Sequence, residues 1–348
     1  MHFASDNAGP VHPAIMAAMA AANDGHAAGY GNDPLTRAVQ DQIRAVFEAP
    51  EAAVYLVATG TAANALILGT LTKPWETAFC TGPAHINVDE CNAPEFYTGG
   101  AKLSLVPDTH AKMGAADLRA RIAETQTGGV HGAQRGPVSI TQVTERGTLY
   151  SLDEIAGLTG VAGEFGLKVH LDGARFANAQ VALGCSAADM TWRAGIDAVS
   201  FGGTKNGCMG VEACVIFDPA LAWEFELRRK RGAHLFSKHR YLAAQMQGYL
   251  ADDLWLDLAA RSNAACRRLA DGLCQMPGGS GMQADPAANM IYMDWPRGLH
   301  QRLFDAGAIY YIERGELAGD DPDELLTGRL VCDWSVTDAA IDRFLGLL

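Results

Sequence analysis

The chain has 348 residues, 49% of them hydrophobic, which is enough for two domains of ordinary size with buried cores. Its formal net charge of −13 argues against a polyanionic partner such as nucleic acid, because phosphate binding depends on Lys and Arg. The longest early apolar run, residues 14–22, is short and follows no basic segment, so we expect no export signal, no membrane insertion and a place in the cytoplasm.

Residues 1–33 are rich in Ala, Gly, Asn and Pro and are predicted to form an N-terminal arm rather than a core element. Within it, a short helix is expected to begin at Pro13, and residues 29–31 form a Gly-Tyr-Gly turn. From Pro34 the apolar residues recur at helical spacing, which predicts a helix, and a strand over residues 54–58 follows it.

The middle of the chain alternates between strand-like and helix-like patterns. The predicted strands cover 77–80, 102–106, 138–143, 167–171, 196–201 and 211–217, and the predicted helices cover 116–124 and 153–165. Alternation of this kind predicts an α/β sheet with helices on both faces. We assign residues 34–249 to this large domain.

A smaller C-terminal domain is predicted for residues 250–348. The helical pattern of residues 239–276 is long enough to link the two domains. The alternation that follows has strands at 290–294, 309–312 and 329–333 and helices at 297–306 and 337–347.

The cysteines and three of the histidines have a structural interpretation. The eight cysteines form no CxxC pair and no zinc-like spacing with histidine, so we expect no metal site and buried thiols in a reducing compartment. His131, His170 and His234 have no neighbouring motif and are taken as structural residues.

Two short motifs carry the chemistry of the chain. Asp172-Gly-Ala-Arg175 ends one strand-like run, and Ser200-Phe-Gly-Gly-Thr-Lys205 ends the next, with one helix-sized stretch between them. A strand, a helix and a second strand that are joined by short links form a parallel pair of strands. Asp172 and Lys205 should therefore meet at the carboxyl ends of these strands. Pyridoxal phosphate needs both: a lysine for its Schiff base and a carboxylate beside its ring nitrogen. Taken singly, the acid could be a turn former or helix cap and the lysine a solvated loop residue.

A phosphate site is predicted at Gly60 and Thr61, where a Gly-Thr turn opens an apolar helix after a strand. Free backbone N–H groups and a hydroxyl at a helix N-terminus suit a dianionic phosphate. An ordinary helix cap by Thr61 is the alternative. The hydroxyl of Thr204 could reach the same phosphate.

Seven segments in this order resemble a known family. They are Ser5–Asn7, Tyr30–Pro34, Thr59–Asn64, Ala84–Ile86, Asp172–Arg175, Ser200–Lys205 and the late Arg329. Together they resemble the fold-type-I pyridoxal phosphate enzymes, which are aspartate aminotransferase-like, and among them the β-eliminating lyase group that contains the low-specificity L-threonine aldolases. The resemblance covers nearly the whole chain. It implies a large, mainly parallel, seven-stranded sheet domain, a smaller C-terminal α/β domain, and pyridoxal 5'-phosphate as the cofactor.

The resemblance also assigns roles to single residues. It implies that His85 stacks on the cofactor ring, where an imidazole can also act as an acid or base. Arg175 would hydrogen-bond the phenolic oxygen of the cofactor, and would otherwise be a surface arginine. Arg329 would hold the substrate carboxylate together with Ser5, because a guanidinium suits bidentate capture of a carboxylate. Arg314 is the rival candidate for that role.

The chain departs from the family in one segment. Many threonine aldolases carry an Asn-Thr-His sequence after the fifth strand, where residues 140–147 here read Ile-Thr-Gln-Val-Thr-Glu-Arg-Gly. Gln142 and Thr144 stand where the amide and imidazole would be, so Gln142 is a candidate substrate contact. Tyr30 and the N-terminal arm, by the same resemblance, would complete the site of a neighbouring subunit in a homo-oligomer, a dimer of dimers.

The reaction that the resemblance implies is retro-aldol cleavage of L-threonine, L-allo-threonine and related β-hydroxy-α-amino acids, such as L-phenylserine, to glycine and an aldehyde. Lys205 would exchange with the substrate amine, Asp172 would keep the ring nitrogen protonated, and His85 would take the β-hydroxyl proton, with Thr144 helping to place a water. The same scaffold also permits β-elimination, racemisation or transamination. A nicotinamide-dependent oxidoreductase is disfavoured because no GxGxxG follows the first strand. A catalytically silent assembly protein is the remaining alternative.

Overall fold

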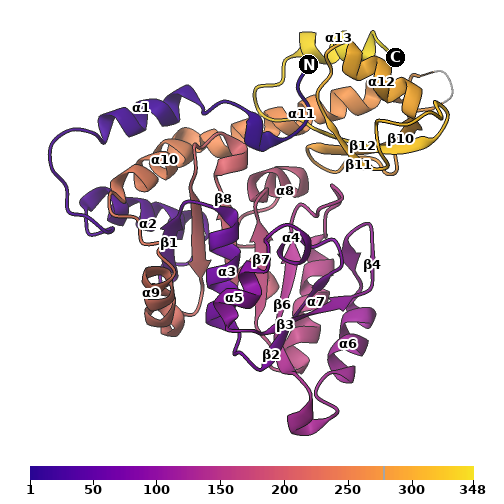
Figure 1. The fold of residues 1–348 in the computed structure, drawn as a ribbon. Helices are drawn as coiled ribbons and strands as arrows, with labels where there is room; N and C mark the ends of the chain where they lie inside the picture. The colour runs from indigo at the N-terminus through magenta and orange to yellow at the C-terminus, as the bar shows by residue number, and fades with distance from the viewer. Residues whose placement is uncertain (277–278) are drawn as a thin grey trace.

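The computed structural model describes residues 1–276 and 279–348, and a seven-stranded sheet forms the centre of its larger part (Figure 1). The strands lie in the order β1-β9-β8-β7-β6-β2-β3, and each pairs in parallel with its neighbours except β9, which is antiparallel to β1 and β8. In chain order they are β1 (Ala53–Val57), β2 (Glu76–Thr81), β3 (Lys102–Val106), β6 (Gln134–Thr141), β7 (Val169–Gly173), β8 (Ala198–Gly202) and β9 (Glu212–Ile216). The predicted α/β sheet, mainly parallel, is confirmed.

Helices cover both faces of this sheet, because successive strand residues point to opposite faces and both sets are apolar. On β1, Val54 and Leu56 join the main core, whereas Ala53, Tyr55 and Val57 join a second cluster on the other face. The helices that contribute to the main core include α2 (Pro34–Val46), α6 (Ala115–Glu124), α7 (Leu152–Glu164), α8 (Phe176–Leu183) and α10 (Arg240–Leu250). The other face is covered by α3 (Gly60–Leu71) and α9 (Ala222–Arg231).

The C-terminal part is built on a three-stranded antiparallel sheet in the order β10-β12-β11. Its elements are β10 (Met290–Pro296), α12 (Arg297–Asp305), β11 (Tyr311–Arg314), β12 (Leu325–Val331) and α13 (Asp338–Leu345). The strand predicted for residues 329–333 therefore begins earlier, at Leu325, and Arg329 lies inside it rather than at its start.

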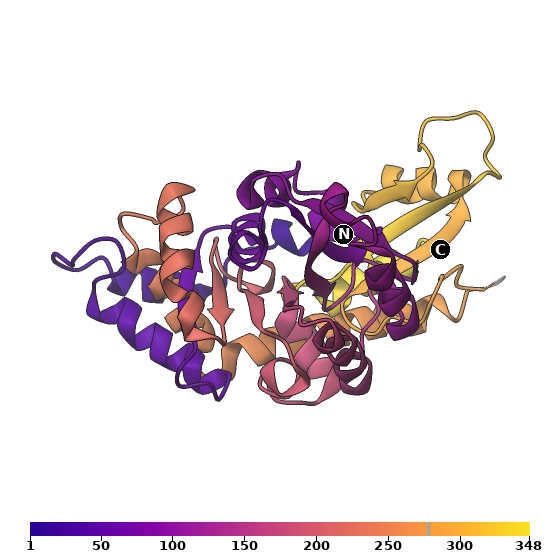
Figure 2. The ribbon, with the colours of Figure 1, turned by 90° about the horizontal axis from the view of Figure 1, so that it is seen from below.

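The N-terminal arm contributes to both cores, contrary to the sequence interpretation. Phe3 is fully buried in the C-terminal core, and its backbone bonds to Ile309 and Val331. Ile15, in α1 (Pro13–Ala21), is fully buried in the main core. The chain begins beside the small sheet and then crosses to α1 at the opposite end of the molecule (Figures 1 and 2). The arm thereby passes the carboxyl ends of the central strands.

The helical stretch predicted for residues 239–276 is broken into α10 and α11 (Leu254–Leu273). Asp252 and Asp253 adopt φ values of 51° and 55°, which an α-helix does not allow. Helix α11 packs in the main core through Trp255 and in the C-terminal core from Cys266 onward. One helix thus belongs to both hydrophobic cores.

Several short elements have no counterpart in the sequence predictions: α4 (His85–Val88), α5 (Ala93–Thr98), β4 (Asp108–Thr109) and β5 (Lys112–Met113), as well as helix α9. In α9 only Phe225 and Arg229 are buried, so its sequence lacks the apolar periodicity that would have revealed a helix. The expectation of buried thiols is right for five cysteines, but Cys91 and Cys274 are exposed.

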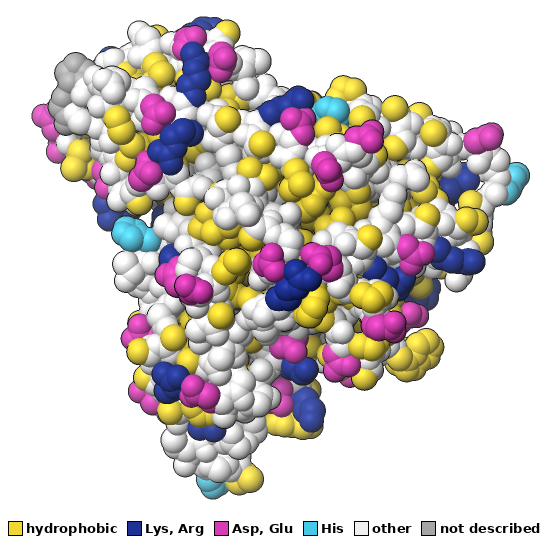
Figure 3. Space-filling view, turned by 180° about the vertical axis from the view of Figure 1, so that it is seen from behind, with side chains coloured by type: hydrophobic (Ala, Val, Ile, Leu, Met, Phe, Trp, Pro, Cys, Tyr) yellow, Lys and Arg dark blue, Asp and Glu magenta, His cyan; other side chains and the backbone are white. Residues whose placement is uncertain are grey.

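No helix in the described part of the chain is both long enough and apolar enough to span a lipid bilayer. The face opposite to that of Figure 1 has hydrophobic side chains in its middle, with charged side chains of both signs around them (Figure 3).

Candidate active site

The residues predicted to bind the cofactor lie around one cavity of about 520 Å³ at the carboxyl ends of the central parallel strands. It receives side chains from the start of α3, from α4 and from the loops that follow β6, β7 and β8. The residues that line it include Asn7, Gly60, Thr61, Asn64, His85, Glu145, Asp172, Arg175, Thr204, Lys205 and Glu212. The carboxyl ends of parallel strands are the usual place for ligands in such sheets.

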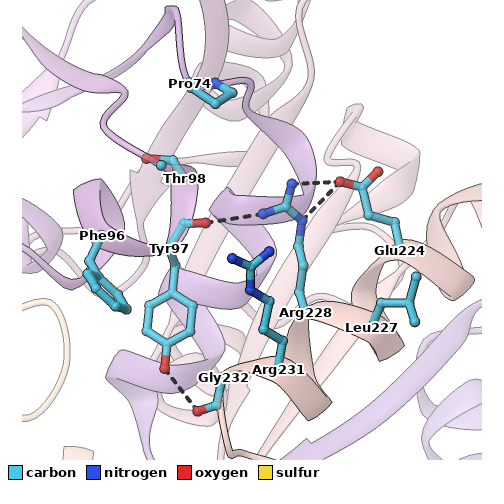
Figure 4. A pocket seen from close by; sticks show the side chains of 10 residues that line it. Pro74, Phe96, Tyr97, Thr98, Glu224, Leu227, Arg228, Arg231 and Gly232 are labelled. Atoms are coloured by element: carbon cyan, nitrogen blue, oxygen red, sulfur yellow. Dashed lines mark hydrogen bonds and ion pairs between the residues drawn. The ribbon is translucent and has the colours of Figure 1, made fainter.

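A second cavity, of about 610 Å³, lies between α5 and α9 (Figure 4). Its arginine Arg228 is committed to Glu224 and to the carbonyl oxygen of Tyr97, which Figure 4 draws as dashed lines. Phe96 at its edge is 79% exposed. The described residues that line it include no lysine, no histidine and only one carboxylate, Glu224, which is bound to Arg228. We therefore look for the chemistry in the 520 Å³ cavity.

Asp172 and Lys205 face the same cavity, as the parallel β7–β8 pair requires. Asp172 accepts hydrogen bonds from Asn64 Nδ2 (2.8 Å) and from the backbone N–H of Ala174 (3.0 Å). Lys205 lies on the single 3₁₀ turn of residues 204–206. Burial lowers the pKa of its ammonium, and the nearby charge of Arg175 lowers it further. The nearby carboxylates raise this pKa, but the lowering effects outweigh them. Both lowering effects favour a neutral, nucleophilic amine.

The first turn of α3 opens onto the cavity. Thr59, rather than Thr61, caps the helix by accepting from the N–H of Ala62 at 3.1 Å. The N–H groups of Gly60 and Thr61 have no acceptor within the helix, because the first four of any helix lack one. A Cβ built on Gly60 would meet nothing within 4 Å, so there is open space beside this turn. Thr204 also lines the cavity, and its Oγ1 accepts from Val211 N–H at 3.1 Å.

His85 is the first residue of α4 and lines the cavity. Its Nδ1 lies 2.8 Å from Oε1 of Glu90, a carboxylate whose side chain is fully buried. The hydrogen bond to Glu90 raises the pKa of His85, although burial acts in the opposite direction. The ring is therefore oriented by a partner that the sequence analysis did not identify.

Arg175 is largely buried, with 12% of its side chain exposed, and is not a surface helix arginine. Its Nε and Nη2 donate to the two oxygens of Asp6 at 2.6 and 2.9 Å. Asp6 comes from the N-terminal arm and also accepts from Asn289 Nδ2 at 3.1 Å. Burial by itself would raise the pKa of Asp6, but Arg175 and Lys205 outweigh it and hold that pKa below its ordinary value of 3.8. Asp6 thus ties the arm, the central sheet and the small domain together beside the cavity.

We expect the Asp6→Asn variant to lose about 3 to 5 kcal/mol of unfolding free energy, because it leaves the charge of Arg175 buried without a counterion. A carboxyl group whose pKa is lower in the folded than in the unfolded state stabilises the folded protein at pH values above its unfolded-state pKa. This contribution disappears as the pH falls through its folded-state pKa. The wild type should therefore lose stability below about pH 4, and the variant should lack this part of the acid dependence. Denaturant titrations between pH 3 and 7 measure both effects, with the exposed Asp24→Asn as the control. Equal stability of Asp6→Asn and wild type at pH 7 would contradict the expectation.

Arg329 and Ser5 lie next to each other but do not line the cavity. Arg329 donates from Nη2 to the carbonyl oxygen of Ala4 at 3.3 Å, and its Nε is buried without a hydrogen-bond partner among the described residues. Ser5 accepts from the N–H of Asn7, which keeps its hydroxyl oxygen within its own turn. The rival Arg314 belongs to a different cavity, beside Glu313. A buried donor without an acceptor is available for a carboxylate, and of the two arginines Arg329 is the one that offers it.

Three residues named from the sequence face elsewhere. Gln142 is fully buried, and both ends of its amide bond to the backbone of Tyr150. Thr144 is fully buried, its hydroxyl bonds to that of Thr148, and it is not among the described residues that line the cavity. Tyr30 is 49% exposed, under the ammonium of Lys230, and does not line the cavity. Gln142 therefore supports its own loop, and Tyr30 contacts no group of this cavity within one chain.

Three carboxylates that were not predicted from the sequence also line the cavity, namely Asp89 and the hydrogen-bonded Glu145 and Glu212. Glu145 accepts from the N–H of His85 at 2.9 Å and from the hydroxyl of Thr141 at 2.7 Å. Glu212 accepts from Gly203 N–H at 3.0 Å, and its burial raises the pKa to about 7. Glu145 and Glu212 each had a signal: Glu145 belongs to the segment that departs from the family, and Glu212 is the one charge in an apolar strand. Asn64 was part of a quoted motif but had no role.

Comparisons with known proteins agree with this geometry. The sequence profile of the β-eliminating lyase family matches residues 2–296. The low specificity L-threonine aldolase of Pseudomonas aeruginosa is 38% identical over 341 residues, which cover 98% of this chain and 94% of that protein. A threonine aldolase structure from Leishmania major superposes with a TM-score of 0.91 at 27% identity, covering 99% of this chain and 98% of the other. The serine palmitoyltransferase of Sphingomonas wittichii shares the fold, with a TM-score of 0.71 at 16% identity, covering 100% and 86%.

Proposed function

The chain belongs to the β-eliminating lyase family and has the fold of the fold-type-I enzymes, and on this basis we propose that it is a pyridoxal 5'-phosphate-dependent aldehyde-lyase. It cleaves L-threonine, L-allo-threonine and related β-hydroxy-α-amino acids to glycine and an aldehyde. The observation that carries the proposal is that Lys205, Asp172 and His85 line one cavity, in a chain 38% identical to a low-specificity L-threonine aldolase.

The residues of the cavity fit pyridoxal 5'-phosphate. The open space beside Gly60, with the first N–H groups of α3 and the hydroxyls of Thr61 and Thr204, suits the phosphate. Asp172 would pair with the ring nitrogen, Arg175 with the phenolic oxygen, and the ring of His85 would stack on the cofactor. Lys205, whose amine is made more nucleophilic by burial, would hold it covalently. When bound, the cofactor supplies an electron sink for the bond that breaks.

The side chains around the cavity direct this sink toward one bond of the substrate. Arg329 lies outside the cavity lining, and its Nε has no hydrogen-bond partner among the described residues, so it would be free to bind the substrate carboxylate, together with Ser5 of the arm segment that it contacts. Holding the carboxylate would fix the orientation of the substrate, which decides whether its Cα–Cβ bond is the one that breaks. His85 accepts the proton of the β-hydroxyl, and the electrons of that O–H bond form the carbonyl of the aldehyde. The amine of Lys205 lines the same cavity and would be in place to displace glycine at the end of the reaction.

The alternative reactions at the same site are β-elimination, racemisation and transamination. They begin at the Cα–H bond of the substrate, whereas aldol cleavage breaks the Cα–Cβ bond, so the orientation of the substrate decides between them. A neutral histidine that takes the β-hydroxyl proton promotes aldol cleavage, whereas racemisation and transamination do not use that proton. The position of His85 in the cavity therefore favours the aldolase proposal.

We expect purified enzyme to release aldehyde and equimolar glycine from L-threonine, L-allo-threonine and L-phenylserine. The aldehyde is measured by coupled reduction and the glycine by chromatography, with the Lys205→Ala protein as the blank. Formation of pyruvate or another keto acid in place of the aldehyde would contradict the proposal and indicate β-elimination or transamination. The relative rates of the three substrates give the preferred β-substituent.

Assembly into a homo-oligomer, with Tyr30 completing a neighbouring site, is part of the proposal. Large apolar side chains on the surface support it, among them Phe96, Trp223 and Leu227. The dimer of dimers and the cytoplasmic location stay predictions from the sequence.

A further inference from the structure

The ring of His85 is held on one side by the buried carboxylate of Glu90. Glu90 lies between α4 and α5, and its side chain is fully buried, whereas that of His85 is 36% exposed toward the cavity. The distance between Nδ1 of His85 and Oε1 of Glu90 is 2.8 Å. The backbone N–H of His85 is bound separately by Glu145 at 2.9 Å. Two glutamates from different loops thus hold one residue.

The hydrogen bonds at Glu90 determine which nitrogen of His85 carries the proton. Oε1 of Glu90 also accepts from Asn64 Nδ2 at 2.8 Å. Burial raises the pKa of Glu90, whereas the hydrogen bonds with His85 and Asn64 lower it. Because Oε1 already accepts from Asn64, we infer that it also accepts from His85, which places the hydrogen between them on Nδ1. Among the described residues no side chain or backbone group bonds to Nε2 of His85. Nε2 is therefore the nitrogen with the lone pair that exchanges protons with the cavity.

Asn64 links this pair to the electron-sink carboxylate. Its Nδ2 donates to Glu90 and to Asp172, each at 2.8 Å, and its Oδ1 accepts from the hydroxyl of Ser200 at 2.7 Å. The opposite amide orientation would point a carbonyl oxygen at two carboxylates, so the orientation is determined by charge. One rigid amide therefore sets the position of Glu90 relative to Asp172.

We propose that Glu90 is a positioning residue for the base of the reaction: it holds His85 by Nδ1–H, directs Nε2 to the β-hydroxyl of the substrate, and is itself held by Asn64. This inference rests on the proposed function for its substrate. In the step concerned, the β-hydroxyl proton moves to Nε2, Nδ1 keeps its own proton, and Glu90 compensates the charge of the imidazolium. Glu90 acts only through His85.

The electrostatics of the surrounding groups agree with this role. The hydrogen bond and charge of Glu90 raise the pKa of His85, and the charge of Asp172 adds to this effect. Burial and the charge of Lys205 lower it, and Glu145 faces only the backbone N–H. Without the carboxylate at position 90, the pKa of His85 should fall. Because the neutral ring is the base, the acid limb of kcat/KM should then move to lower pH.

The tautomer of His85 tests the proposal in the unaltered protein. In wild-type apoenzyme labelled with ¹⁵N-histidine, we expect neutral His85 to carry its proton on Nδ1, with the resonance assigned by the His85→Gln variant. A neutral His85 protonated on Nε2 would overturn the proposal. This measurement requires neither the cofactor nor activity, and it decides the question even if a variant at position 90 does not fold.

The Glu90→Gln variant tests the effect on titration and rate. We expect the NMR titration of His85 in the apoenzyme to shift to lower pH, with the exposed His26 as the internal control. Threonine cleavage should fall on the order of tenfold to a hundredfold, mainly in kcat, as expected for a misplaced base. The exposed Glu51→Gln should leave both unchanged. An unshifted His85 in folded Glu90→Gln would overturn the proposal, whereas absence of cleavage by the wild type would overturn only the proposed function.

Discussion

The Lys205→Ala variant is expected to lose at least about a thousandfold in kcat for threonine cleavage, together with the visible absorbance of the holoenzyme. Lys205 is the only lysine among the described residues that line the cavity, and its burial favours the neutral amine that a carbonyl cofactor needs. Without it, pyridoxal 5'-phosphate could bind only through its phosphate and ring contacts. Absorbance spectra before and after dialysis measure the covalent attachment, and aldehyde release measures the rate.

The matched control for this loss is Lys102→Ala, which removes an exposed lysine on β3. Lys102→Ala should keep the colour and the rate of the wild type. If Lys205→Ala stayed yellow after dialysis, another amine would hold the cofactor and the assignment of the site would be wrong. A colourless wild type unable to take up pyridoxal 5'-phosphate would favour the silent assembly protein instead.

The Asp172→Asn variant is expected to fold and to bind the cofactor but to lose about a hundredfold to a thousandfold in kcat, the usual cost of removing one group that stabilises transition-state charge. The introduced amide would keep an oxygen for Nδ2 of Asn64, which now bonds to Asp172 at 2.8 Å. It would not keep the negative charge that holds a proton on the ring nitrogen, so the electron sink would weaken.

Three measurements separate this effect from misfolding: cofactor affinity, thermal unfolding and kcat at saturating L-threonine. The loss should appear in kcat, whereas the exposed Asp271→Asn should leave all three quantities unchanged. An Asp172→Asn enzyme with wild-type kcat would show that the carboxylate does not pair with the ring. The same variant also changes the surroundings of Asn64, because one of the two carboxylates that accept hydrogen bonds from its amide loses its charge.

The parallel strands and the residues at their ends were predictable because their signals are local. Apolar runs such as that of β7 end on Asp172, and parallel order follows from one intervening helix. Helix α9 and the short helix α4 were not predictable in this way. The first has almost no buried apolar face, and the second is shorter than two helical turns. His85 was found by resemblance, and the helix that carries it only by structure.

The substrate-side predictions show where local reasoning fails. Gln142 and Thr144 were matched by position to the segment that holds the family histidine, but their side chains bond within their own loop, and their neighbour Glu145 reaches the cavity instead. In an irregular loop the direction of a side chain does not follow a period of two or 3.6, so sequence position cannot predict it. Arg175 was placed correctly at the cavity, but its partner Asp6 is 169 residues away.

The sequence by itself determined the α/β class, the order of the sheet-forming segments that carry Asp172 and Lys205, and the glycine-threonine turn, because these depend on side-chain periodicity and short-range spacing. Only the tertiary structure decided which groups orient them. Asp6 pairs with Arg175, Asn64 joins Asp172 to Glu90, and Glu90 holds His85. The physical reason is that a buried charge or amide must find its partner wherever folding brings one, and such partners come from segments that are distant in the chain.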